Sequence, residues 1–138
     1  MEHIRLAYLA GFFDGEGCIY IDKDWRKNTP NYQLVVRVKL KASASSPLNI
    51  YTEIFGGNIY DEHPKNANPQ KSWRLNGKNA ANFLNNIIPY LVLKKEQAEL
   101  ALEFYNTKIT DAPGGYVTPE ESNRREYFYK KLKEIKAA

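Results

Sequence analysis

The sequence predicts an α+β fold, with helices packed against a four-stranded antiparallel, saddle-shaped sheet. The order helix, strand, strand is predicted twice, in residues 4–41 and 46–76, although the sequence shows no convincing internal repeat. The clearest signal lies in residues 32–41, where every second residue is apolar, as in a strand with one buried face. Further helices follow, which gives an αββαββα core with extra C-terminal helices. The 138 residues are expected to form one domain, with its core at 4–107 and a C-terminal helix at about 118–136.

The first helix, predicted over residues 4–14, is apolar along most of its length and runs into two carboxylates, Asp14 and Glu16. Ala7, Gly11 and Gly15 recur at every fourth position and therefore share one helix face, where small side chains let a second helix come close. Glycine inside a helix costs about 1 kcal/mol relative to alanine. We therefore expect this face to be a dimer interface.

The strand predicted over residues 17–26 places Glu16 at the junction of helix and sheet. Beside a partner helix, this carboxylate can meet its equivalent in a second copy, and two such charges repel unless a cation separates them. Mg²⁺ binds one or two carboxylates together with phosphate oxygens, so metal-assisted phosphodiester hydrolysis is the chemistry to test. The alternative is a helix that ends in a turn with both acids merely solvated. The glycines do not match the dinucleotide pattern G-x-G-x-x-G.

The strand predicted over residues 32–41 carries Arg37, Lys39 and Lys41 on its outer face, opposite the apolar face formed by Leu34, Val36, Val38 and Leu40. Three cations in five residues indicate either a nucleic-acid contact or a solvated sheet face, since an antiparallel sheet with one wet face needs no ligand. Turn residues at 27–31 separate this strand from the one before it.

In the rest of the chain, capping residues, prolines and glycines mark where the predicted helices begin and end. Ser46 is the expected N-cap of a helix with Pro47 in its first turn, and Gly56 and Gly57 end that helix. Pro89 separates two further helices, and residues 118–121 form a capping box for the last helix. The remaining predicted elements are strands at 58–63 and 72–76, helices at 78–88 and 91–107, and a linker at 111–115.

Composition narrows the possible functions. One cysteine, Cys18, excludes an internal disulfide and a cysteine-based zinc site, and two histidines make a histidine-rich metal site an unfavoured choice. The N-terminus has no basic region before its apolar stretch, and no apolar run is long enough to span a membrane. We therefore expect an intracellular protein, in an organelle or in the cytoplasm of a prokaryote or phage-infected cell. A net charge of +4 and a pI of about 9.1 modestly favour a polyanionic partner.

Residues 9–17, Leu-Ala-Gly-Phe-Phe-Asp-Gly-Glu-Gly, resemble the LAGLIDADG motif of homing endonucleases. Further segments resemble the same family in the same order: residues 55–60, 73–77, 89–91 with Lys94, 97–100 and 102–104. The resemblance covers about residues 4–104. Only one copy of the motif is present, which in this family implies a homodimer.

The resemblance implies roles for individual residues. Glu16 falls on the metal ligand, where aspartate is common, and the carbonyl of Gly15 would be a second metal contact. Lys94, with Lys95 as the adjacent alternative, falls on a basic residue near the site. Leu40 falls where the family often has a polar residue, and Lys39 or Lys41 would supply that function if the register differs by one. The expected cofactor is Mg²⁺, with Mn²⁺ or Ca²⁺ able to occupy the same site.

The function implied by the resemblance is that of an intron-encoded, site-specific endonuclease. It would cut a long, roughly palindromic double-stranded DNA site to leave short 3′ overhangs. No membrane and no small-molecule substrate is expected. The side chains expected to contact DNA are Tyr20, Asp22, Asp24, Arg26, Gln33, Arg37, Lys39, Lys41, His63 and Arg74.

Two other functions stay open from the sequence. One is a non-cleaving nucleic-acid binder on the same fold, such as an intron maturase or a DNA-binding regulator. Leucine at position 40, where the family often has a polar residue, is compatible with this alternative. The other is a small structural or interaction domain whose first helix is a dimer seam. That domain would bind DNA without the steep salt dependence of a protein that neutralises many phosphates.

Overall fold

The computed structural model describes residues 2–26, 28–108 and 117–138 and confirms the predicted α+β fold with a four-stranded antiparallel sheet. Between the elements lie short 3₁₀ turns at Ala42–Ala44 and Ile88–Tyr90. The helices and strands are α1 (Glu2–Glu16), β1 (Gly17–Arg26), β2 (Thr29–Lys41), α2 (Leu48–Phe55), β3 (Asn58–Glu62), β4 (Gln70–Asn76), α3 (Gly77–Ile87), α4 (Lys95–Asn106) and α5 (Pro119–Ala137).

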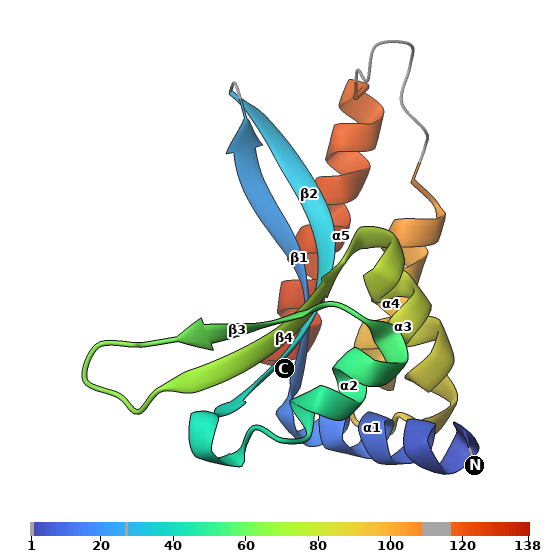
Figure 1. The fold of residues 1–138 in the computed structure, drawn as a ribbon. Helices are drawn as coiled ribbons and strands as arrows, with labels where there is room; N and C mark the ends of the chain where they lie inside the picture. Colours follow the sequence, from blue (N-terminus) through green and yellow to red (C-terminus); the bar gives the residue numbers. More distant parts are fainter. Residues whose placement is uncertain (1, 27, 109–116) are drawn as a thin grey trace.

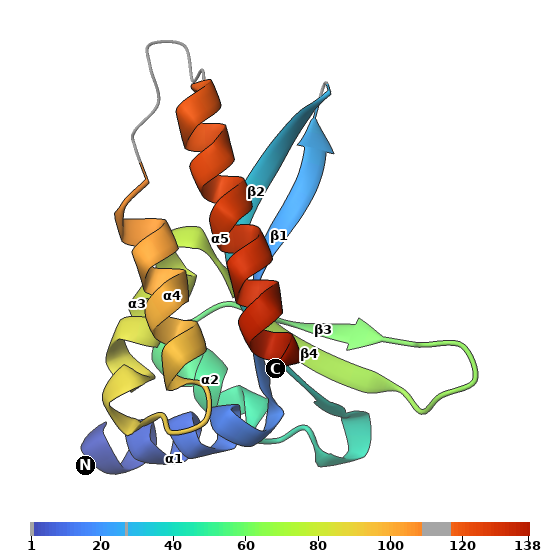
Figure 2. The ribbon, with the colours of Figure 1, turned by 180° about the vertical axis from the view of Figure 1, so that it is seen from behind.

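The strands lie in the order β1-β2-β4-β3, and all neighbours are antiparallel. The β1-β2 and β3-β4 hairpins diverge from the middle of the sheet, while α1 extends away from them at the bottom of the view, below α2 and α3 (Figure 1). Seen from behind, α4 and α5 lie across the β1-β2 side of the sheet (Figure 2). Alternate strand residues on this helix-covered face are buried, among them Ile19, Leu34, Val36 and Leu75. None of the described helices is long and apolar enough to cross a membrane.

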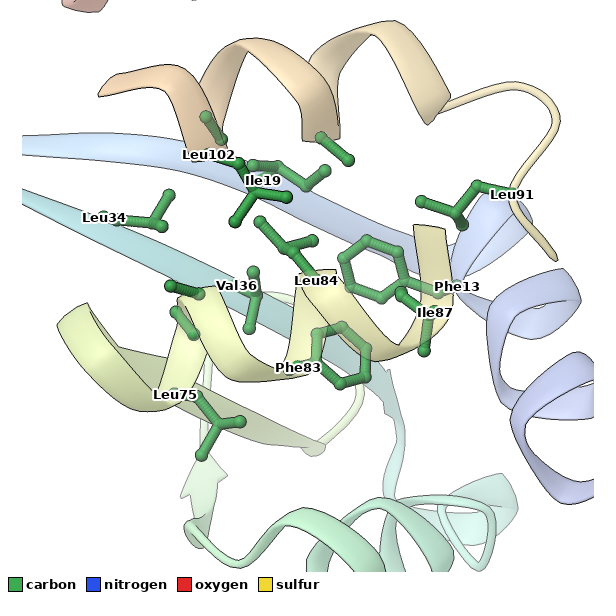
Figure 3. Packing of buried hydrophobic residues seen from close by; sticks show 14 of the residues in the cluster. Phe13, Ile19, Leu34, Val36, Leu75, Phe83, Leu84, Ile87, Leu91 and Leu102 are labelled. Carbon is green, nitrogen blue, oxygen red and sulfur yellow. The ribbon is translucent and has the colours of Figure 1, made fainter. Parts of the chain in front are cut away.

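The core is centred on Phe83 of α3. Its ring lies 5.2 Å from that of Phe13, 5.1 Å from that of Trp73 and 4.9 Å from that of Phe55, measured between ring centroids. Figure 3 shows Phe83, Leu84 and Ile87 pointing from α3 toward strand residues and Phe13. Burying each such side chain is worth about 1.5–3 kcal/mol. The end of α1 is therefore fixed to the sheet through Phe13.

Two local features hold α1 in place. A Cβ at Gly17 would lie 2.2 Å from the Phe13 ring, so only glycine lets β1 start directly beside that ring. The Tyr51 hydroxyl of α2 donates a buried hydrogen bond of 2.7 Å to the carbonyl of Leu9. Both contacts lie on the buried face of α1, and they leave its opposite face exposed.

The element boundaries differ from the prediction in several places. Residues 29–31, predicted as part of a turn, begin β2, because they pair with the last three residues of β1. Helix α1 extends to Glu16 instead of ending at Asp14. Two further differences are at helix starts. Ser46 is not the N-cap of α2. Pro47 occupies that position, and no side chain caps the helix there. The Ser45 hydroxyl donates a 2.8 Å hydrogen bond to the carbonyl of Ala42, in the turn before the helix. Helix α4 begins at Lys95 rather than at 91. The Thr118 cap is confirmed, because its hydroxyl accepts a 3.2 Å hydrogen bond from the amide of Glu121. The linker predicted at 111–115 lies outside the described residues.

Helix α5 is attached to the hairpin β1-β2 by Glu126. This carboxylate accepts hydrogen bonds from the Lys23 ammonium, at 2.7 Å, and from the Tyr32 hydroxyl. Near the end of the helix, the Lys136 ammonium donates a 2.8 Å hydrogen bond to the carbonyl of Ile19. The hydrogen bonds from Lys23 and then Tyr32 lower the pKa of Glu126 below the usual glutamate value.

The stabilisation from Glu126 should depend on pH. Because its folded-state pKa is lowered, the contribution is complete above the ordinary glutamate pKa and is lost as the pH falls through the lowered value. We expect Glu126→Gln to reduce the free energy of unfolding at pH 7 by on the order of 1–2 kcal/mol, with a smaller difference from the unmodified chain in acid. Urea unfolding at several pH values measures this. Glu134→Gln, an exposed acid on the same helix, is the control and should change little. A pH-independent loss in Glu126→Gln would contradict the assignment.

Candidate functional site

The C-terminal end of α1 carries the central candidate residue. Glu16 is the last residue of α1, and its side chain is exposed where β1 begins. The last carbonyls of a helix lack intrahelical partners, and the helix dipole makes this end negative. Together with the Glu16 carboxylate, these groups favour a cation.

Asp14 fixes the segment before α4 against this helix end. Its carboxylate accepts hydrogen bonds from the backbone amides of Val92, at 2.8 Å, and Lys94, at 2.9 Å. The Lys94 ammonium in turn donates to the backbone carbonyl of Asp14, at 2.8 Å. The structure therefore brings Lys94 to the helix end that carries Glu16. Lys95, the predicted alternative, is an exposed residue in the first turn of α4.

The face of α1 that carries Ala7, Gly11 and Gly15 is exposed. An added Cβ at Gly11 or Gly15 would meet no heavy atom within 4 Å. Two larger apolar side chains share this exposed side, Ile4 at 70% and Tyr8 at 50% exposure. They line an apolar hollow together with Arg5 and Ile50 of α2. Within the described residues, the small residues therefore face open space.

The strand register places the predicted contact residues together on the sheet face opposite the helices. They alternate along the strands with the buried residues of the core, so that a largely polar face results, which also includes the buried Val35. Lys39 on this face pairs with Glu62 at 3.2 Å, and Asp24 lies 3.8 Å from Arg26. His63 is exposed and follows the end of β3. The predicted residues on this face, which we call the polar sheet face, are Tyr20, Asp22, Asp24, Arg26, Gln33, Arg37, Lys39, Lys41 and Arg74.

Several residues of the polar sheet face were missed from the sequence. Tyr60 and Glu62 of β3 lie here, beside Ser72 and Gln70 of β4. Strand β3 is polar on both faces apart from Ile59, so alternation alone gives a weak signal for its orientation. Leu40 occupies the position where the family often has a polar residue. It lies on the opposite face from Lys39 and Lys41, partly buried against the core.

The donors at the end of α1 fit a hard divalent cation in kind. Carboxylate and carbonyl oxygens are the ligands that Mg²⁺ and Ca²⁺ prefer. Among residues 2–26, 28–108 and 117–138, no three His, Cys, Asp or Glu side chains gather closely enough to hold a metal ion. One chain thus offers the Glu16 carboxylate and backbone carbonyls, and a full coordination shell needs oxygens from elsewhere.

The fold is shared with several solved endonucleases. The homing endonuclease I-CvuI, solved with its target in the presence of calcium, matches with a TM-score of 0.80 and 22% identity over 97% of this chain and 83% of that chain. The archaeal intron-encoded homing endonuclease I-Vdi141I, solved with DNA, matches with a TM-score of 0.77 and 19% identity over 98% and 86%. I-GzeII, a LAGLIDADG homing endonuclease solved with its DNA target, matches at 0.68 and 19% over 96% of this chain and 44% of that chain.

A search of curated proteins found no match. The model of the LAGLIDADG endonuclease family matches residues 9–110, which include the end of α1, all four strands and the Asp14–Lys94 contact. Because this match spans most of the chain, the protein belongs to the LAGLIDADG endonuclease family.

Proposed function

We propose that the protein is a homodimeric, metal-dependent endonuclease that cuts a specific double-stranded DNA site. The observation that carries the proposal is the hydrogen bond that holds the Lys94 ammonium to the carbonyl of Asp14, two residues before Glu16 at the same helix end, beside a helix face of small residues. A cation-attracting carboxylate next to a fixed ammonium suits hydrolysis of a phosphodiester, in which negative charge develops on oxygen.

The dimer would form through the exposed face of α1. Ala7, Gly11 and Gly15 let two helices approach backbone to backbone, and Ile4 and Tyr8 would add apolar contact. A two-fold axis between the two copies of α1 would bring both Glu16 residues to the same region, one for each DNA strand. It would also make the target roughly palindromic, and cuts staggered across the two strands would leave short 3′ overhangs.

The polar sheet face would lie in the major groove, which admits a two-stranded β-ribbon. Exposed cations on this face, such as Arg26 and Lys41, would neutralise phosphates, while side chains nearer the middle would meet base edges. The two hairpins diverge and so follow a curved surface (Figure 1). With a second copy, the polar face would extend along a full site.

Glu16 and the carbonyl of Gly15 would hold Mg²⁺, with Mn²⁺ or Ca²⁺ able to bind in the same place. When bound, the ion supplies an activated water and stabilises the leaving oxygen. Lys94 would hold its ammonium beside the scissile phosphate and balance the developing charge. Asp14 would act through Lys94, because it fixes both the backbone amide and the ammonium of that residue.

Glu16→Gln should abolish cleavage while leaving DNA binding intact, because the amide keeps the size of the side chain and removes its charge. Cleavage of a plasmid carrying the DNA that flanks the natural coding sequence is measured with Mg²⁺, and binding is measured by gel shift with Ca²⁺. Glu99→Gln, an exposed glutamate of α4, is the matched control and should cut normally. Cutting by Glu16→Gln at the normal rate would remove Glu16 from the mechanism.

Lys94→Met should slow cleavage by about 10²–10³-fold, the usual cost of losing one charge-stabilising donor in an active site. Lys95→Met is the matched control and should change the rate little, since Lys95 points from the first turn of α4 into solvent. Single-turnover cleavage rates distinguish the two. Equal effects of both substitutions would indicate a general electrostatic contribution to DNA binding.

Gly11→Lys should convert the dimer to a folded monomer. The structure has open space around Gly11, so the longer side chain fits within one chain but would meet the partner helix. Sedimentation equilibrium measures the oligomeric state, and thermal unfolding measures the fold. Asn85→Lys, an exposed site on α3, is the control and should stay dimeric. A dimeric Gly11→Lys protein would place the interface elsewhere.

The second candidate is a non-cleaving nucleic-acid binder of the same family. It is favoured by Leu40, which lies against the core rather than on the polar sheet face. Such a protein would bind the flanking DNA with the steep salt dependence of phosphate neutralisation but leave it intact with Mg²⁺ or Mn²⁺.

A further inference from the structure

The two hairpins of the sheet carry the same side chains at the same register positions. In the first hairpin, Tyr20 lies on β1, and the residue two positions before it pairs with Arg37 of β2. In the second, Tyr60 lies on β3, and the residue two positions before it pairs with Arg74 of β4. The residue two positions after each tyrosine is an acid, Asp22 or Glu62, paired in both hairpins with a glutamine.

The equivalence extends beyond the tyrosines and arginines. It is hidden in the sequence because the outer strands are offset by 40 positions and the inner strands by 37, so that no single shift aligns both. The offset changes because ten residues, most of them paired, connect Asp22 to Gln33 in the first hairpin, whereas seven connect Glu62 to Gln70 in the second. The matched pairs are Gly17 and Gly57, Ile19 and Ile59, Tyr20 and Tyr60, Asp22 and Glu62, Gln33 and Gln70, and Arg37 and Arg74.

Arg37 and Arg74 lie directly opposite each other where the inner strands β2 and β4 pair. A local two-fold axis therefore passes between them, and the guanidinium of each arginine lies over the tyrosine ring of its own hairpin. The Arg74 guanidinium carbon lies 4.6 Å from the centroid of the Tyr60 ring, and that of Arg37 lies 5.5 Å from the Tyr20 ring. The centre of the polar sheet face thus holds two arginines, each supported from outside by an aromatic ring.

Stacking on a ring restricts the plane of a guanidinium and leaves its N–H edge free. This reduces the conformational entropy lost on binding and suits bidentate recognition. In the major groove, a bidentate arginine pairs with O6 and N7 of guanine. A phosphate contact needs only charge, and it is disfavoured here because Asp22 and Glu62 stand on the same face, each two residues after the tyrosine that lies beside the arginine.

We propose that Arg37 and Arg74 are specificity-determining residues that each read a guanine within the half-site, and that Tyr20 and Tyr60 position them. The proposal rests on the proposed DNA-binding function and deepens it. It also changes the expected role of Tyr20, from contacting a base to supporting Arg37. Because the arginines are opposite each other across one strand pair, the two guanines should lie close together in the target.

The test uses a pool of random-sequence DNA duplexes, selected for binding to the full-length protein with Ca²⁺ in place of Mg²⁺. We expect the selected half-site to contain two neighbouring guanines on which binding depends. Arg74→Lys keeps the charge but loses the planar fork, so discrimination at one of these guanines should fall by about 5- to 150-fold while other positions are unchanged. Arg37→Lys should have the same effect at the other guanine.

Variants of Tyr60 show whether this tyrosine positions Arg74 or contacts the DNA itself. Tyr60→Leu should weaken the preference for the same guanine as Arg74→Lys, whereas Tyr60→Phe keeps the ring and should retain it. Thermal unfolding of each variant checks the fold, which should survive because Arg74 and Tyr60 are exposed. An Arg74→Lys protein that binds all sequences more weakly by the same factor would overturn the proposal, as would one whose base preferences are unchanged.

Failure of the guanine readout can be told apart from failure of the proposed endonuclease activity. A wild-type protein that selects a specific duplex but does not cut it with Mg²⁺ contradicts the nuclease, while loss of one guanine in Arg74→Lys still supports the readout. A protein that cuts its site, with base preferences that do not change in Arg74→Lys, contradicts the readout alone. Selection of no specific duplex contradicts both.

Discussion

The geometry of the candidate site at the end of α1 depends on the contact between Asp14 and the segment that precedes α4. The Asp14 carboxylate accepts hydrogen bonds from the backbone amides of Val92 and Lys94. The backbone carbonyl of Asp14 accepts a third hydrogen bond, from the Lys94 ammonium. Hydrogen bonds to a charged group contribute about 1.5–3 kcal/mol each, and less where the bond is exposed, as at Val92. This set joins the end of the first helix to a residue about eighty positions later, and it holds the Lys94 ammonium at a carbonyl two residues before Glu16.

The core keeps this contact in register. Phe13 lies one residue before Asp14 and packs on Phe83 of α3, and α3 leads through the Ile88–Tyr90 turn to the segment that Asp14 holds. Glycine at position 17 lets the first strand begin against the same ring. The position of Glu16 is thus set by apolar packing on one side of α1, while the opposite side of that helix is left to other contacts.

Much of the fold could be predicted because its signals are local. Alternation in residues 32–41 and the apolar residues around Phe83 defined the sheet and helices, and strand β1 was predicted with its observed bounds, 17–26. Glu16 was singled out by its place between the first helix and the first strand, and Lys94 through the family resemblance; the roles of both stay predictions. The start of α4 could not be predicted, because the long-range hydrogen bonds of Asp14 determine the conformation before it. The internal repeat was missed for a related reason, since only strand pairing aligns Tyr20 with Tyr60.

The contact of Lys136 with the carbonyl of Ile19 has a consequence for how molecules of this protein meet. Strand β1 is at one edge of the sheet, and an open edge is a template for adding strands from other chains. The last turn of α5 occupies part of that edge with an ammonium group. The opposite edge, β3, is five residues long and carries Asp61 and Glu62, which repel a like strand. Extension of the sheet by strands of other copies is thereby discouraged at both edges.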